Sequence, residues 1–393
     1  MQIERENQPI TADIFCRVVD NYGDIGVCWR LARRLAHGKG WSVRLWVDDL
    51  ASFQVLAPAI DTDRNTQHID GIVVRHWHDQ SDARPAQVVI EAFACDPPER
   101  YVAAMRQASR PPVWINLEYL SAEHWVEDCH GAASLRPDGL RKNFFFPGFT
   151  TGTGGLLREP GLIAARNDVV HSISSRAATL RSLGLPDLAE RLHDPSHRCA
   201  SLFCYPQAPL SALFAGWASS RPARAQTTVC VPTHVAPGVE DLAERHDISV
   251  IRMPFFSQTD YDRLLWCMDF NVVRGEDSFV RAIWSGRPML WHIYPQENQA
   301  HMDKLDAWLA LAGLPPAVQT AHRLFNRSED GLADSVAAHA PLQRLADVFA
   351  VCFQPDVWEP WQRAAHAHCE TETSMSDLAD NLADFCMSRL HSS

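Results

Sequence analysis

The chain has 393 residues, 46% of them hydrophobic and 21% charged, so it should fold throughout, as two domains of roughly 150 to 200 residues each. The net charge of −12 argues against general nucleic-acid binding, because sequence-independent contacts with phosphate need clustered lysine and arginine. A polar opening segment and the lack of a long apolar run argue against membrane insertion, and eleven scattered cysteines without a Cys-x-x-Cys pair indicate a cytoplasmic protein with reduced thiols.

Strands and helices alternate along the first half of the chain. The predicted elements, in order, are a strand at 14–19, a helix at 26–37, strands at 43–47, 71–75 and 87–91, a helix at 97–107, and a strand at 113–116. This alternation predicts a parallel, doubly wound sheet with helices on both faces.

A second alternating series follows a looser region. The loop 144–155 is rich in aromatic residues, threonine and glycine, which is typical of a segment that covers a site or meets a partner. After a helix at 174–183, strands are predicted at 200–205, 227–231, 248–251, 270–273 and 288–291.

Two Rossmann-like domains are therefore expected, at 1–185 and 186–357, with ligands in a crevice between them. Residues 358–393 should be helical, and a return of this segment to the first domain is compatible with the pattern.

The first candidate site follows the first strand. Asp20 and Asp24 flank a glycine turn at the sheet edge where open α/β proteins bind ligands, which favours acid or base chemistry. Gly23 and Gly26 permit close backbone approach, although a Gly-x-Gly-x-x-Gly fingerprint is absent. The alternative is purely structural, with Asp24 capping the helix and Asp20 closing an Asx turn.

The second candidate site is the segment from Arg274 to Ser278, between a strand and a helix. Gly275 allows a sharp turn, Asp277 or Ser278 can cap the helix, and the first helical N–H groups then face an anion. Arg274 adds a forked cation suited to a pyrophosphate. The alternative is a capped helix with a surface ion pair.

Aromatic residues lie on the first predicted strand of the second series and just after its third. Phe255 can stack on a base whose edge Gln258 reads with a donor and an acceptor, and Phe203 and Tyr205 point the same way from one strand. All three aromatic residues can equally be core packing.

Other motifs carry less chemistry. The runs 76–78 and 61–63 resemble metal-ligand spacings but lack a third ligand, so no metal is predicted.

Taken together, these motifs resemble the protein-arginine rhamnosyltransferases that modify translation elongation factor P (EF-P). The residues that carry the resemblance are Asp20 to Val27 with Trp29 to Arg33 behind them, Phe203, Tyr205, Phe255, Gln258, and Arg274 to Ser278. The resemblance implies a GT-B glycosyltransferase, with two Rossmann-like domains facing across a cleft, that transfers rhamnose with inversion from dTDP-β-L-rhamnose to an arginine of EF-P.

The resemblance also implies roles for residues of the first domain. Asp24 would be the catalytic carboxylate and Asp20 its neighbour in the acceptor site. The residues Asn21, Tyr22 and Gly23 would belong to the acceptor-side loop.

In the second domain, the resemblance implies that Phe255 stacks on thymine and that Gln258 touches the base. The residues expected at the ribose and diphosphate are Arg274, Asp277 and Ser278, with Phe203 and Tyr205 alongside. Glu276 would lie near the reacting sugar.

Three alternatives to this function stay open at this point. One is a nucleotide-sugar epimerase and another a glycosyltransferase acting on a small acceptor, because the same two-domain plan serves both. The third is a non-catalytic adaptor that senses a nucleotide. The sequence decides neither the oligomeric state nor which of Asp20 and Asp24 accepts a proton.

Overall fold

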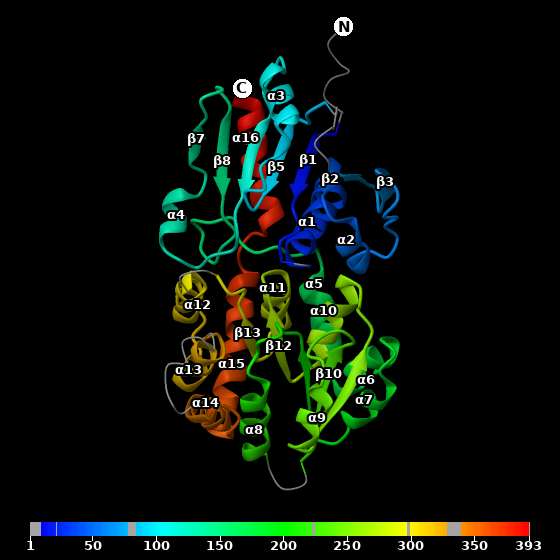
Figure 1. Ribbon diagram of the computed structural model, residues 1–393, viewed down its shortest axis with the longest axis vertical. Coiled ribbons are helices and arrows are strands. Elements are labelled where there is room, and N and C mark those ends of the chain that lie inside the picture. Colours follow the sequence, from blue (N-terminus) through cyan, green and yellow to red (C-terminus); the bar gives the residue numbers. More distant parts are fainter. Residues whose placement is uncertain are drawn as a thin grey trace. The chain divides into compact units, whose positions relative to one another are not determined.

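The structure is a computed structural model that describes residues 9–20, 22–77, 84–221, 225–296, 299–327 and 339–392 (Figure 1). The chain divides into two compact units, Met1–Pro160 with Met375–Ser393, and Gly161–Ser374. The predicted boundary near residue 185 therefore falls inside the second unit. Helices α5 (Leu162–Val170) and α6 (Ile173–Ser182) pack against α10 (Gln258–Cys267) of that unit, so the second unit begins at Gly161 and not near residue 185.

The first unit contains an eight-stranded sheet in the order β3-β4-β2-β1-β5-β6-β8-β7. Its strands are β1 (Thr11–Cys16), β2 (Ser42–Val47), β3 (Thr66–Ile69), β4 (Ile72–His76), β5 (Val88–Ala92), β6 (Val113–Leu117), β7 (Ala133–Leu135) and β8 (Arg141–Phe145). The central strands pair in parallel, and β3 and β7 are antiparallel edge strands.

Helices cover both faces of this sheet. They are α1 (Gly23–Arg33), continued by the π-helical turn η1 (Arg34–Gly38), then α2 (Leu50–Leu56), α3 (Glu99–Gln107), α4 (Trp125–Cys129) and α16 (Leu378–Ser392). Alternate side chains of β1 enter different cores, since side chains of a strand point to opposite faces. Ile14 packs in a cluster with α1, α2 and α16, whereas Phe15 packs with Trp46, Trp114 and α3.

The C-terminal helix α16 returns to the first unit, as Figure 1 shows in red. Arg34 and Asp377 form a buried ion pair that fixes its start. The loop 144–155 packs against this C-terminal segment, because the side-chain amide of Asn381 donates to the Gly154 carbonyl at 2.9 Å. Gly155 has a φ of +79°, and a Cβ there would lie 2.5 Å from the Ser376 carbonyl oxygen. The glycines of the loop 144–155 are therefore needed where it packs against the C-terminal segment.

The second unit contains a five-stranded, fully parallel sheet in the order β11-β10-β9-β12-β13. Its strands are β9 (Arg198–Leu202), β10 (Thr227–Pro232), β11 (Ile248–Met253), β12 (Phe270–Arg274) and β13 (Met289–His292). Its remaining helices are α7 (Pro186–Arg191), α8 (Leu210–Ser220), α9 (Val239–Glu244), α11 (Asp277–Ser285), α12 (Ala300–Leu311), α13 (Pro316–Phe325), α14 (His339–Cys352) and α15 (Pro355–Thr373).

The predicted α/β class with two Rossmann-like sheets is confirmed. The short edge strands β3 and β7 were not predicted, and Phe144 and Phe145 belong to β8 and not to a loop. The first strand ends at Cys16, so residues 17–19 already belong to the connection after β1.

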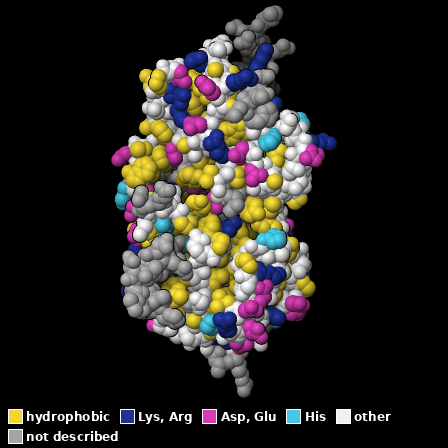
Figure 2. All heavy atoms as spheres, viewed as in Figure 1, with side chains coloured by type: hydrophobic (Ala, Val, Ile, Leu, Met, Phe, Trp, Pro, Cys, Tyr) yellow, Lys and Arg dark blue, Asp and Glu magenta, His cyan; other side chains and the backbone are white. Residues whose placement is uncertain are grey.

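The eleven cysteines are all free thiols, and all but Cys129 are buried. On the face shown in Figure 2, basic side chains are interspersed with acidic and apolar ones. Within the described part of the chain, no helix combines the length and apolar character that a membrane crossing requires.

Candidate functional site

Each sheet has a point where the strand order reverses. In the first unit β1 lies between β2 and β5, and in the second unit β9 lies between β10 and β12. The connections that leave β1 and β5, or β9 and β12, diverge at the carboxyl ends of the strands. Open parallel sheets bind their ligands in the space that this divergence leaves. Both predicted groups of residues lie at these two points.

Asp24 is fixed in the first turn of α1, just after β1, and is 3% exposed. Its Oδ2 accepts hydrogen bonds from the backbone N–H groups of Val19 and Asp20, at 2.8 and 2.9 Å. Its Oδ1 accepts one from the hydroxyl of Tyr119 at 3.4 Å. The carboxylate therefore joins the helix, the loop after β1 and the segment after β6.

Burial dominates the ionisation of Asp24. It raises the pKa of this carboxyl group, and the nearby Asp20 charge raises it further. The two backbone N–H groups and the Tyr119 hydroxyl act in the opposite direction, but the net pKa stays above its ordinary value. A carboxylate with a raised pKa is a better proton acceptor than one on the surface.

The helix-cap interpretation of Asp24 is wrong. The residue at the N-cap position of α1 is Tyr22, and its side chain makes no capping hydrogen bond. Asp24 instead binds backbone groups that precede the helix, so it orders the loop that carries Asp20. The predicted acceptor-side residue Asn21 lies outside the described residues.

Gly23 is required by the close approach of Asp20. The Gly23 N–H donates to the Asp20 carbonyl at 2.7 Å, and a Cβ on Gly23 would lie 2.9 Å from Asp20 Oδ2. Asp48, directly after β2, accepts a hydrogen bond from the Val18 N–H at 2.9 Å and holds the start of the same loop. Asp20 and Asp24 are thus brought together, with Asp20 partly exposed.

In the second unit, Arg274 lies at the end of β12 and meets both aromatic residues that follow β9. Its guanidinium carbon is 4.4 Å from the ring centre of Phe203 and 4.9 Å from that of Tyr205. One of its nitrogens donates to the Cys204 carbonyl at 3.4 Å. The aromatic faces therefore hold the guanidinium group at the carboxyl edge of the sheet.

The predicted base-binding residues lie beside this group. Phe255 is 37% exposed, and its ring is 6.3 Å from that of Phe203. Its neighbour Phe256 packs into the core instead, so the two consecutive phenylalanines have different roles. Gln258 is buried at the start of α10 and donates to Asp277 Oδ2 at 3.3 Å.

The start of α11 has no side-chain cap, so the expected capping by Asp277 or Ser278 is wrong. Glu276 occupies the N-cap position without a capping hydrogen bond, and the Ser278 hydroxyl donates to the Arg274 carbonyl. Gly275 has a φ of +63°, which lets the chain turn from β12 into the helix. The first N–H groups of α11 therefore lack a side-chain cap beside Arg274, as an anion site requires.

Buried polar groups that were not predicted support this edge. His292 ends β13, and its Nδ1 accepts a hydrogen bond from the Tyr205 N–H at 3.2 Å. Burial lowers the pKa of His292 to about 3, which keeps the ring neutral and able to accept. Asp262 and Arg281 form a two-pronged ion pair, at 2.7 and 2.9 Å, that joins α10 to α11.

Tyr119 and Phe93 were also missed in the first unit. Phe93 follows β5, which pairs with β1, and Tyr119 follows β6, which pairs with β5, so the rule that places ligands at the carboxyl ends of parallel strands pointed to their positions.

The weaker metal-like motifs do not form clusters in the described residues. His76 Nε2 contacts the Asp48 carbonyl, Asp61 pairs with Arg64, and His78 lies outside the described residues. No group of three or more His, Cys, Asp or Glu side chains with metal-binding geometry occurs in the described ranges.

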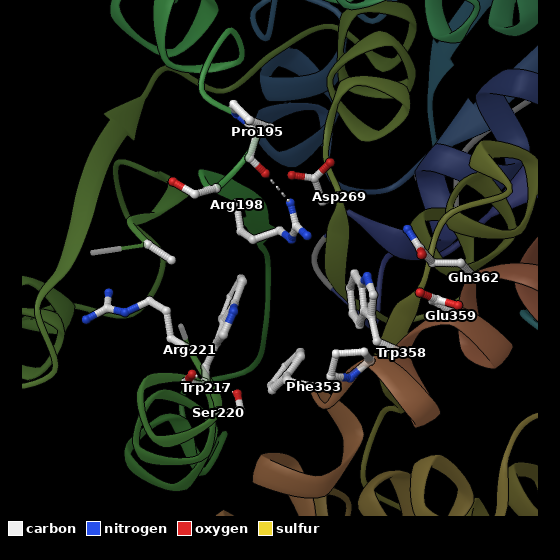
Figure 3. Close-up of a pocket in the computed structure, with 13 residues that line it drawn as sticks. Pro195, Arg198, Trp217, Ser220, Arg221, Asp269, Phe353, Trp358, Glu359 and Gln362 are labelled. Atoms are coloured by element: carbon white, nitrogen blue, oxygen red, sulfur yellow. Dashed lines mark hydrogen bonds between the residues drawn. The ribbon is translucent and has the colours of Figure 1, made fainter. Parts of the chain in front are cut away.

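A cavity of about 420 Å³ lies elsewhere in the second unit (Figure 3). Its lining includes Arg198, Trp217, Asp269 and Trp358. Arg198 begins β9 and Asp269 precedes β12, so the cavity lies at the amino edge of the sheet, opposite the edge with Arg274. None of the predicted donor residues lines it, and it is not the candidate site.

Comparison with known proteins agrees with this arrangement. Residues 12–387 match the family of Elongation-Factor P (EF-P) rhamnosyltransferase EarP. The protein-arginine rhamnosyltransferase of Pseudomonas putida is 50% identical over 76% of this chain and 81% of its own length, and that of Pseudomonas aeruginosa is 44% identical over 95% and 98%.

Solved structures show the same fold. A structure of EarP-mediated arginine glycosylation of translation elongation factor EF-P aligns with a TM-score of 0.58 and 30% identity, over 96% of this chain and 99% of that one. UGT2 of Phytolacca americana, with UDP-2-fluoroglucose and pterostilbene, shares the fold at a TM-score of 0.51 and 10% identity, over 97% and 100%. The architecture is GT-B, and the chain belongs to the EarP family of protein-arginine rhamnosyltransferases, which are glycosyltransferases.

Proposed function

We propose that this enzyme transfers rhamnose, with inversion, from dTDP-β-L-rhamnose to an arginine side chain of EF-P. The observation that carries the proposal is the convergence of the motif residues at the two points where strand order reverses. In the second unit they gather around Arg274, and in the first they gather around Asp24. Family membership supports the protein acceptor over the small-acceptor and epimerase alternatives, and gives no support to a non-catalytic adaptor.

The second unit would bind the donor. Phe255 offers an exposed ring to thymine, and Gln258 offers an amide to the edge of the base. Arg274 and the N-terminal N–H groups of α11 provide fixed positive charge for the diphosphate, and this charge would stabilise dTDP as it leaves. Fixed donors of this kind can replace a metal ion. That the enzyme needs no metal ion remains a prediction.

The first unit would supply the base. As the bond between the guanidinium nitrogen and the sugar carbon forms, the bond from that carbon to the phosphate oxygen breaks, and the proton of the nitrogen passes to Asp24. The raised pKa of Asp24 suits this step, because an arginine nitrogen gives up its proton reluctantly. Asp20 would orient the guanidinium group, and Glu276 would lie near the reacting sugar.

A direct test is to incubate the enzyme with dTDP-β-L-rhamnose and purified EF-P, and to measure the intact mass of EF-P. The expected result is the addition of one rhamnosyl group, which peptide mapping places on an arginine. Unchanged EF-P together with dTDP release on a small acceptor would contradict the proposal. The cytoplasmic location expected from the sequence stays a prediction.

The Asp24→Asn variant tests the proposed base. Its turnover should fall by about two orders of magnitude or more, because asparagine cannot accept the proton. Binding of dTDP-rhamnose, measured by calorimetry, should stay close to that of the unchanged enzyme, since Asp24 belongs to the other unit.

Asp70→Asn is the matched control for this substitution. Asp70 is an exposed aspartate of the same unit in a left-handed turn that asparagine tolerates, and it should keep full activity. Full turnover by Asp24→Asn would reject the assignment of the base.

A further inference from the structure

The carboxylate of Asp24 is oriented by three hydrogen bonds. The Val19 and Asp20 N–H groups occupy Oδ2, and the Tyr119 hydroxyl approaches Oδ1. A carboxylate offers about four lone-pair directions. The three donors therefore leave one direction on Oδ1, to which a guanidinium nitrogen of the protein substrate can donate. The position of the Tyr119 hydroxyl therefore selects the direction from which Asp24 can take a proton.

The Tyr119 ring is itself held by a stacked partner. Its ring centre lies 4.3 Å from that of Phe93, with 14° between the planes. Tyr119 follows β6 and Phe93 follows β5, so two neighbouring connections at the carboxyl edge support one another. Stacking at this distance restricts the tilt of the phenol and hence the position of its oxygen.

The backbone that presents Phe93 is strained. Phe93 and Ala94 have φ angles of +57° and +52°, which residues with a side chain rarely adopt. Residues with such strained backbone angles cluster at functional sites. The strain is held in place because Asn116 Oδ1 accepts from the Ala94 N–H at 3.1 Å and the Leu117 carbonyl accepts from the Phe93 N–H at 2.7 Å.

We propose that Tyr119, supported by Phe93 on a strained turn, is a positioning residue that orients Asp24 and favours its ionised form. The inference rests on the proposed role of Asp24 as the base. The phenol donates to the charged carboxylate, so it opposes the effect of burial. Among the residues that the structure describes, the charged or titratable groups that face Asp24 are Asp20 in the same loop, Cys16 at the end of β1 and Tyr119 itself.

The Tyr119→Phe variant removes the hydroxyl but keeps the stacked ring, so the protein should fold normally. In this variant the pKa of Asp24 should rise, because the Tyr119 hydroxyl no longer stabilises the charged carboxylate. The acid limb of the pH dependence of kcat should therefore move to higher pH. At the acid end kcat should be more than about fivefold below that of the unchanged enzyme, and on the plateau within about twofold. The KM for dTDP-rhamnose should not change.

Tyr101→Phe is the matched control, because Tyr101 also donates a phenol hydrogen bond to an aspartate, Asp13, in the same sheet. This variant should lose stability without moving the acid limb. An unmoved limb in Tyr119→Phe, or an equal loss of activity at every pH, would overturn the inference.

A second readout separates this inference from the proposed function. Carboxyl carbon NMR of aspartate-labelled full-length enzyme follows the titration of Asp24 without any substrate, and the Asp24→Asn spectrum identifies its signal. A higher pKa in Tyr119→Phe supports the inference even if EF-P proves not to be the acceptor. An unchanged pKa rejects it even if rhamnose transfer is confirmed.

Discussion

At the scale of single residues, Asp20 and Asp24 differ by burial more than by chemistry. Both are carboxylates after the same strand, but Asp24 is 3% exposed and bound by three donors, whereas Asp20 is partly exposed. Burial raises the pKa of Asp24, which brings this carboxyl group closer to the range useful for proton transfer at neutral pH. The deeper burial of Asp24 supports the proposal that Asp24, and not Asp20, accepts the proton.

Arg274→Ala is expected to weaken dTDP-rhamnose binding more than it slows the bound complex. A charge-assisted contact with phosphate contributes about 1.5 to 3 kcal/mol, which corresponds to a tenfold to hundredfold increase in Kd. Isothermal calorimetry with dTDP measures it. Arg323→Ala is the control, since Arg323 pairs with Asp306 on the surface of the same unit and should leave Kd unchanged. Equal affinity of the two variants for dTDP would show that Arg274 does not bind the donor.

At the scale of elements, α10 and α11 carry the proposed donor residues and are joined by one buried ion pair. The side chains of Asp262 and Arg281 are 4% and 1% exposed, and their two contacts are at 2.7 and 2.9 Å. This pair fixes the two helices that begin with Gln258 and Asp277.

Asp262→Ala should lower the free energy of unfolding by about 3 to 5 kcal/mol, because it leaves a buried guanidinium group without its main counter-charge. Asp260→Ala removes a similar carboxylate from the same helix, but its pair with Arg263 is partly exposed and should contribute about 0 to 1 kcal/mol. Denaturant unfolding compares the two. Equal losses would show that the buried pair has no special role.

Helix α15 contains a second buried group with a shifted pKa. Burial raises the pKa of Glu372 to about 8 and lowers that of His368 to about 4. The Trp308 indole donates to His368 Nε2 at 3.3 Å, which agrees with a neutral histidine ring. His368 Nδ1 and Glu372 Oε1 lie 3.8 Å apart. At neutral pH both side chains are therefore predominantly uncharged and do not form an ion pair.

This assignment predicts how stability depends on pH. Between pH 6.5 and 8 the folded state keeps a proton on Glu372 that the unfolded chain has released, so stability falls as pH rises. Below about pH 6.5 His368 acts in the opposite direction, because the unfolded chain protonates first.

Glu372→Gln should therefore lose less stability than the unchanged protein between pH 6.5 and 8. Thermal unfolding at a series of pH values measures the difference. Glu370→Gln, an exposed site on the same helix, is the control and should keep the original slope. A Glu372→Gln slope equal to that of the control would contradict the raised pKa.

At the scale of the whole molecule, the last helix completes the first unit. Leu378, Leu382 and Cys386 of α16 are at most 1% exposed and belong to the same core as Ile14 and Leu45. The chain therefore enters the second unit at Gly161 and leaves it at Ser374 before its first unit is complete.

Truncation after Ser374 should leave the first unit unable to fold, because it exposes one face of the sheet core. Aggregation and loss of rhamnose transfer are expected, and light scattering with an activity assay measures them. Removal of residues 391–393 is the control: the exposed His391 lies beyond the buried positions of α16, so activity should remain. A soluble, active truncation at Ser374 would show that α16 is dispensable.

The sequence alone determined the class of fold and pointed to two groups of candidate residues. Parallel strands are buried on both faces, and the helices between them are amphipathic, so the periodicity of residues such as Ile14 and Val273 reveals them locally. The edge strands β3 and β7 were not predicted because they are short and because an edge strand pairs on one side only, so its side chains show a weaker hydrophobic pattern.

Only the tertiary structure decided which contacts the candidate residues make. That Tyr119 reaches Asp24 and that α16 returns to the first unit both depend on contacts between segments far apart in the chain. Such contacts arise from the order in which strands pair, and strand order is a property of the folded sheet as a whole. Residue spacing records the local period of the chain and contains no information about that order.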